Sequence, residues 1–112
     1  MKYLRLSVLP TIISLLLILQ GCVTAGQRRQ DYIESRPGLS ADIKTAILEG
    51  RVAEGMTGED VLASWGEPER KTITYSRGGI TELWTYLTPI GHFTSGEVTL
   101  TVTNGHLTGL TN

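Results

Sequence analysis

The sequence predicts an α+β fold, in which two short N-terminal helices pack on one face of a three-stranded antiparallel sheet. Two patterns carry this prediction. Apolar residues recur at helical spacing between residues 41 and 65, and polar and apolar residues alternate with a period of two from residue 70 onward. Two helices on one face of such a sheet form a two-layer sandwich. The sequence after residue 103 leaves room for a C-terminal hairpin extension.

Residues 1–21 precede this predicted domain and have the pattern of a signal peptide. Lys2 and Arg5 are followed by a mostly apolar run over residues 6–19. At about 14 residues the run is shorter than the ~20 that a membrane-spanning helix needs, and it is typical of a signal-peptide core. The run ends in Leu19-Gln20-Gly21-Cys22, with the only cysteine of the chain in last place. An alternative is that Cys22 is a buried apolar residue of a transmembrane anchor.

This ending resembles the bacterial lipobox, which implies that Cys22 carries a diacylglycerol and that the chain is cleaved just before it. Two or more acyl chains anchor a protein stably in a membrane, so the membrane is an expected partner. Val23, rather than Asp, follows the cysteine. By resemblance to enterobacterial sorting, this implies the outer membrane, with the domain facing the periplasm. Because the single cysteine is used for lipid, we expect no disulfide.

Residues 22–38 are predicted to be a lipidated N-terminus and a flexible tether. Their only large apolar residues are Val23, Tyr32 and Ile33, and Pro37-Gly38 punctuates the end. An alternative is a short helix around Tyr32. The folded domain is predicted to cover residues 39–112.

The first predicted helix covers residues 41–49. Ser40 can cap its N-terminus, and Gly50 can end it. Between them, three apolar residues at i, i+3 and i+4 form one stripe: Ile43, Ala46 and Ile47.

The second predicted helix begins after Thr57, within the segment EGMTGEDVLASWGEP. Thr57 as N-cap and Asp60 at the third helical position form an acidic variant of the capping box. Met56 and Val61 are then at the positions of a hydrophobic staple. Gly66 provides a positive φ at the C-terminal end, and Pro68 prevents continuation.

Beyond Pro68 the sequence predicts three strands, at residues 70–76, 80–87 and 97–103. In the second strand Glu82, Trp84 and Tyr86 share one face. Asn104-Gly105 is a type I′ hairpin signal, so residues 106–110 are expected to return as a short edge strand.

These residues resemble the SmpA/OmlA (BamE-like) family of outer-membrane lipoproteins over roughly residues 43–105. The family pattern is matched in register by Gly55, Met56, Thr57, Val61, Gly66 and Pro68, and Trp84 and Tyr86 fall where the family has an aromatic strand. The resemblance implies a helix-helix-three-strand fold. It also implies an accessory role in the complex that inserts β-barrel proteins into the outer membrane.

The sequence offers little for catalysis, a cofactor or a metal. His92 and His106 lie far apart without a metal-binding motif, and we interpret both as surface residues. Glu59 and Asp60 are adjacent, so on a helix their side chains diverge. A net charge of −1 argues against nucleic-acid binding. We therefore expect neither an enzyme nor a cofactor, metal or nucleic-acid partner.

Two functions remain open. In the first, this is a lipid-anchored protein-interaction module, an accessory subunit of outer-membrane protein assembly or of another envelope complex. Its candidate partner surface is Trp84, Tyr86, His92 and Phe93. In the second, it is a stand-alone lipoprotein that binds a ligand or inhibits a protein through the Gly-rich loop at residues 88–96.

Overall fold

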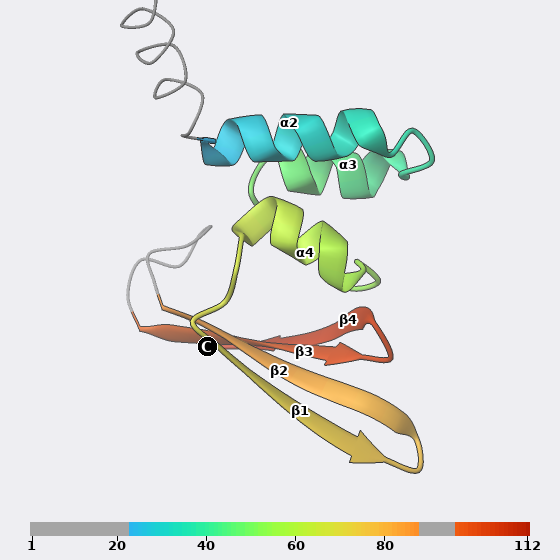
Figure 1. Cartoon of the computed structure of the whole chain (residues 1–112), viewed down its shortest axis with the longest axis vertical. Helices are drawn as coiled ribbons and strands as arrows, with labels where there is room; N and C mark the ends of the chain where they lie inside the picture. The colour runs from blue at the N-terminus through green and yellow to red at the C-terminus, as the bar shows by residue number, and fades with distance from the viewer. Residues whose placement is uncertain (1–22, 88–95) are drawn as a thin grey trace, which may run out of the picture.

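The computed structural model describes residues 23–87 and 96–112 and confirms the α+β class (Figure 1). Within these residues three helices precede four strands. The helices are α2 (Ala25–Ser35), α3 (Ala41–Leu48) and α4 (Gly58–Trp65). The strands are β1 (Arg70–Ser76), β2 (Gly79–Leu87), β3 (Glu97–Thr103) and β4 (His106–Thr111). The predicted signal peptide and Cys22 lie outside the described residues.

Helices α3 and α4 begin where the sequence predicts. The Ser40 hydroxyl accepts the Ile43 N–H at the start of α3. At α4 the capping box is complete. The Thr57 hydroxyl accepts the Asp60 N–H at 3.2 Å, and the Asp60 carboxylate accepts the Thr57 N–H at 3.0 Å. The predicted caps are therefore confirmed.

The prediction of a flexible tether is wrong over Ala25–Ser35, where α2 lies, and the alternative of a short helix around Tyr32 is the one that the structure shows. The Thr24 side chain caps α2 by accepting the Gln27 N–H. The helix buries a single apolar side chain, Ile33, so its apolar content alone gives little reason to fold. The partly buried Tyr32 ring and polar contacts with α4 supply the rest of its packing.

The four strands form one antiparallel sheet in the order β1-β2-β3-β4. The predicted edge strand after Asn104-Gly105 is present as β4. The turn residues have the positive φ values expected for type I′, +50° and +83°. The Asn104 side chain also reaches the β1–β2 hairpin, where it accepts the Ile80 N–H at 2.9 Å. A Cβ on Gly79 would lie 2.0 Å from Asn104 Oδ1, so this position needs glycine.

The helices are stacked on the sheet, which corrects the simple two-layer prediction. Figure 1 shows α4 next to the sheet, with α2 and α3 side by side beyond it. The core lies between these layers. It contains Ile47 of α3, Met56 and Val61 at α4, and the inward side chains of β3, which are Val98, Leu100 and Val102. The sheet's opposite face is exposed to different degrees except at the buried Thr85, and all of β1 is exposed.

Candidate interaction surfaces

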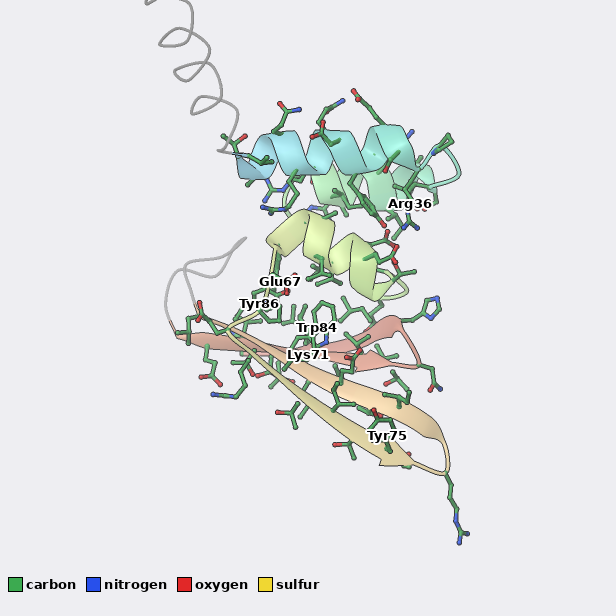
Figure 2. All side chains as sticks on the ribbon, in the orientation of Figure 1. Arg36, Glu67, Lys71, Tyr75, Trp84 and Tyr86 are labelled. Atoms are coloured by element: carbon green, nitrogen blue, oxygen red, sulfur yellow. The ribbon has the colours of Figure 1, made fainter. Side chains whose placement is uncertain are left out.

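The predicted partner surface is wrong at its two strand residues. Trp84 and Tyr86 are only 2% and 3% exposed, because the face of β2 that they share is the one covered by the helices (Figure 2). Tyr86 meets Trp65 edge-on, with 5.2 Å between ring centroids, and donates its hydroxyl to the Gly66 carbonyl at 2.8 Å. His92 and Phe93 lie outside the described residues. The alternation was interpreted correctly, but the aromatic face was assigned to the wrong side.

Trp84 lies between the start of α4 and the edge of the sheet. A Cβ on Gly58 would be 3.2 Å from its indole ring, and the Lys71 ammonium lies 4.2 Å from a ring centroid, in cation–π geometry. The indole N–H is buried and makes no hydrogen bond within the described residues. Trp84 therefore joins the core to the one strand that the helices leave uncovered.

The residues that carry the family resemblance build α4 and its connection to the sheet. Met56 and Val61 are fully buried, as a staple pair requires. Gly66 has a φ of +80°, and Gly55 has a φ of +90°. Pro68 follows the helix end, in the segment that leads to β1. Each of these residues therefore has a structural role, and the two buried ones, Met56 and Val61, are not accessible to a partner.

The C-terminal end of α4 is held by two arginines of α2, which the sequence analysis assigned to a tether. Arg29 donates from Nε and Nη2 to the Ser64 carbonyl at 3.0 and 2.9 Å. Arg28 donates to the Ala63 carbonyl at 3.1 Å. These carbonyls belong to the last turn of α4, which lacks helical partners and carries partial negative charge. Burial, and then the Arg28 charge, lower the pKa of the Arg29 guanidinium, which nevertheless stays protonated.

Tyr32 joins α2 to the other end of α4. Its hydroxyl donates to Asp60 Oδ1 at 2.5 Å, so the capping carboxylate has partners in both helices. Burial, followed by this hydrogen bond, raises the pKa of Tyr32 to about 12. Arg36 lies over the Tyr32 ring and forms an ion pair with Glu59. The adjacent acids Glu59 and Asp60 thus have separate structural roles.

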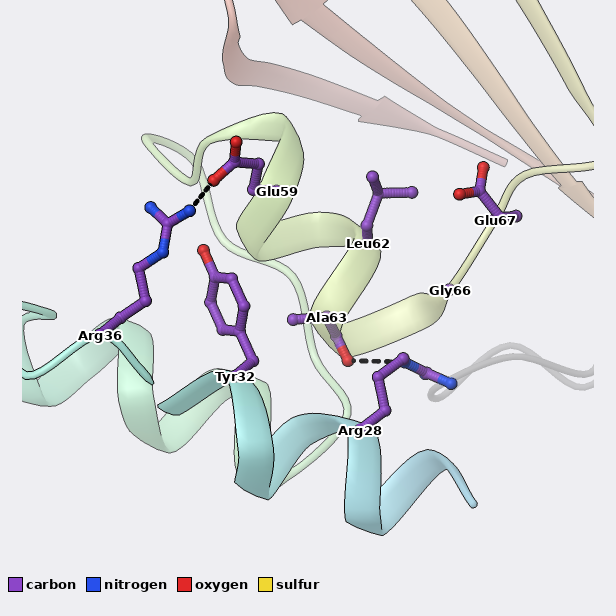
Figure 3. A pocket seen from close by; sticks show the side chains of 8 residues that line it. All are labelled: Arg28, Tyr32, Arg36, Glu59, Leu62, Ala63, Gly66 and Glu67. Atoms are coloured by element: carbon purple, nitrogen blue, oxygen red, sulfur yellow. Dashed lines mark hydrogen bonds and ion pairs between the residues drawn. The ribbon is translucent and has the colours of Figure 1, made fainter. Parts of the chain in front are cut away.

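A groove of about 490 Å³ runs between α2 and α4 (Figure 3). Arg28, Tyr32 and Arg36 line it from α2, and Glu59, Leu62 and Glu67 line it from α4 and the segment that follows. Three of its polar groups from the α2 side are already engaged: Arg28 with Ala63, Tyr32 with Asp60, and Arg36 with Glu59. A ligand in this groove would have to displace these contacts.

The sheet offers two further surfaces. On the side away from the helices, which we call the outer face, Leu83 and Leu87 of β2 are exposed beside rows of threonines from the neighbouring strands. The second surface is β1, all of whose residues are exposed. On its helix-facing side Ile73 and Tyr75 adjoin the exposed Ile80 of β2.

The described residues provide no metal site, since no group of three or more His, Cys, Asp or Glu side chains gathers among them. His106 is exposed at the start of β4.

No helix within residues 23–87 or 96–112 is long and apolar enough to cross a membrane.

Comparisons of the chain with models of protein families, with curated proteins and with solved structures find no match.

The role of α2 was the main feature that sequence reasoning missed. The sequence does contain features that indicate this helix. Thr24 is a good N-cap residue, no proline interrupts residues 25–35, and Pro37 follows the end. Arg28, Tyr32 and Arg36 recur every four residues, which places them on one helical face. A polar stripe of this kind is harder to recognise than an apolar one, because its partners are backbone carbonyls.

Proposed function

We propose that this chain is a lipid-anchored outer-membrane lipoprotein whose periplasm-facing domain is a non-catalytic protein-interaction module. The observation that carries the proposal is the Leu19-Gln20-Gly21-Cys22 ending of an N-terminal apolar run. The proposal is also supported by the position of the described domain, because Thr24, the N-cap of α2, comes only two residues after that cysteine.

The finer assignment, to the SmpA/OmlA-like lipoproteins, is part of the same proposal. Its support is that the matched residues act together. Thr57 caps α4, Met56 and Val61 are buried beside the cap, and Gly66 ends the helix with a positive φ. This resemblance makes an accessory subunit of outer-membrane protein assembly, or of another envelope complex, the expected role.

We assign partner binding to the outer face of the sheet, in place of the buried Trp84 and Tyr86. Leu83 and Leu87 are on the same side of β2 and are exposed next to polar side chains. Exposed apolar side chains within a polar surround are common at protein–protein interfaces. The alternative, a stand-alone ligand-binding lipoprotein, has the groove between α2 and α4 as its supporting observation. In that groove Arg28, Tyr32 and Arg36 are already paired with α4, which favours the partner-binding function.

The test has two parts, beginning with the anchor. Cys22→Ser should leave an unprocessed precursor that takes up no labelled fatty acid, whereas Thr24→Ser, two residues away, should be labelled like the native chain. Continued labelling of the Cys22→Ser chain would contradict lipid attachment.

The second part is capture of partners from detergent-solubilised envelopes. The native chain should enrich a barrel-assembly or secretion component, and Leu83→Lys should reduce this enrichment at least tenfold. Leu48→Lys on α3 is the matched control, because Leu48 and Leu83 are similarly exposed, at 48% and 41%. Recovery of no envelope component by the native chain, or equal loss in both variants, would argue against the proposed function.

A further inference from the structure

Strand β1 forms an open edge of the sheet, whereas the opposite edge is partly covered. At β4 the Gly55 N–H donates to the Leu107 carbonyl at 2.9 Å, and the Leu107 N–H donates to the Met56 carbonyl at 2.7 Å. No segment of residues 23–87 or 96–112 pairs with the edge of β1 that points away from β2. The strand has seven residues and contains no proline or glycine. It therefore lacks the proline and the bulge that often protect an edge, and its two charged residues, Arg70 and Lys71, are both at its start.

The register identifies which backbone groups of β1 are available. Ser76 pairs with Gly79 across a two-residue loop, which requires these two residues to form a hydrogen-bonded pair. Hydrogen-bonded and non-hydrogen-bonded pairs alternate along an antiparallel ladder. The N–H and C=O groups of Lys71, Ile73 and Tyr75 therefore point away from β2, toward the open edge.

The side chains of β1 are complementary to those of a second antiparallel copy of the same strand. A two-fold axis beside Ile73 pairs all seven residues and joins the three outward-facing backbone positions. Ile73 then faces the partner's Ile73, and Lys71 faces the partner's Tyr75. On the other side of the sheet Thr72 faces the partner's Thr74, and Arg70 faces the partner's Ser76. No residue faces a like charge, and the two Lys71 side chains are about 13 Å apart along the strands.

We propose that two copies of this chain associate through antiparallel pairing of β1, centred on Ile73, into one continuous eight-stranded sheet. Tyr75 is 75% exposed at the end of the hairpin that projects beyond the helices (Figure 2). Antiparallel pairing places this end beside the helix-covered end of the other copy. There the partner's Tyr75 lies next to Lys71, whose ammonium already stacks on Trp84. Lys71 therefore lies between Trp84 of its own core and the partner's Tyr75, and these three side chains link the core to the interface.

This interface is independent of the proposed envelope partner, because it uses the edge of the sheet and the helix-facing side of β1, whereas that partner is assigned to the outer face. Pairing of one seven-residue strand buries less surface than a standard protein interface. We therefore expect a weak dimer, with a dissociation constant in the micromolar range, and the measurements should extend to several hundred micromolar.

The first experiment measures the mass of the full chain in detergent by sedimentation over this concentration range. The native chain should dimerise, and Ile73→Lys and Ile73→Glu alone should each weaken dimerisation at least tenfold, because like charges then face each other across the axis. An equal mixture of the two variants should restore a dimer. A native chain that stays monomeric, or single variants that dimerise normally, would overturn the proposal. Unchanged thermal unfolding of each variant shows that the fold is intact, as expected for a side chain that is half exposed.

A second experiment tests the register by disulfide formation in a chain whose Cys22 is replaced by Ser. Ile73→Cys should form a disulfide-linked dimer on oxidation. Ile80→Cys is the matched control, since Ile80 is on the same side and similarly exposed, at 43% against 47%. It is one strand further from the axis and should not cross-link. Equal cross-linking at both positions, or cross-linking of Ile73→Cys only to a different protein in whole cells, would rule out pairing of two copies.

Discussion

At the scale of single residues, Thr57 and Asp60 are the residues whose roles the sequence predicts best. Each satisfies an N–H at the start of α4, and both interactions are local, three residues apart. Local hydrogen bonds of this kind depend only on neighbouring residue types, so a sequence pattern is sufficient to predict them. The Tyr32 hydroxyl on Asp60 is a contact over 28 residues, and no local pattern indicates it.

Thr57→Ala should lower the free energy of unfolding by about 1 kcal/mol, because the Asp60 N–H loses its acceptor. For a domain of this size that corresponds to a fall in Tm of roughly 4–8 °C. Thermal unfolding followed by circular dichroism is a sufficient measurement. Thr45→Ala, within α3, is the control and should not destabilise the protein, since alanine favours a helix interior. Equal Tm values for the native chain and Thr57→Ala would show that the cap contributes no stability.

At the scale of elements, the strands and the two later helices could be predicted because their patterns are apolar and periodic. Strands β1 and β3 have the predicted bounds, and α3 and α4 begin after the predicted caps. Helix α2 could not be predicted in the same way, because it buries only Ile33 and is held by Arg28 and Arg29 on distant carbonyls. The sidedness of β2 also depends on tertiary structure. Alternation shows which residues share a face, but only packing shows which face is covered.

Arg29→Ala should release α2 from α4 while the sheet stays folded. The Ser64 carbonyl loses two hydrogen bonds from a charged donor, for which a loss of about 1.5–3 kcal/mol is expected. Amide hydrogen exchange of residues 25–35 should accelerate about tenfold to a hundredfold, with little change in β2 and β3. Gln30→Ala, on the exposed side of α2, is the control. Unprotected α2 amides in the native chain would instead support the original prediction of a flexible tether.

At the scale of the whole molecule, two tyrosine hydroxyls connect the stacked layers. Tyr32 joins α2 to the start of α4, and Tyr86 joins the sheet to its end. Burial raises the pKa of both, with the Asp60 hydrogen bond adding to the effect at Tyr32 and the Glu67 charge adding to it at Tyr86. Both hydroxyls therefore hold their protons more tightly in the folded chain than in the unfolded chain.

The free energy of unfolding should consequently fall as pH rises above about 10, the ordinary tyrosine pKa, toward the raised value of about 12 at Tyr32. In that range the folded chain keeps a proton that the unfolded chain has lost. Tyr32→Phe cannot ionise. Its deficit relative to the native chain should be constant below pH 10 and should shrink at higher pH, as measured by urea unfolding at several pH values. A constant deficit for Tyr32→Phe at all pH values would contradict this linkage.

The position of α2 also determines how far the domain could travel from a membrane. Residues 22–38 as an extended tether would reach up to ~60 Å, whereas the step from Cys22 to the helix cap at Thr24 reaches only ~7 Å. With the proposed lipid on Cys22, the volume that the domain explores would shrink by a factor on the order of several hundred. Encounters would be confined to a thin layer beside the bilayer, where the effective concentration of other anchored proteins is high. A partner would therefore have to present its binding site close to the membrane surface.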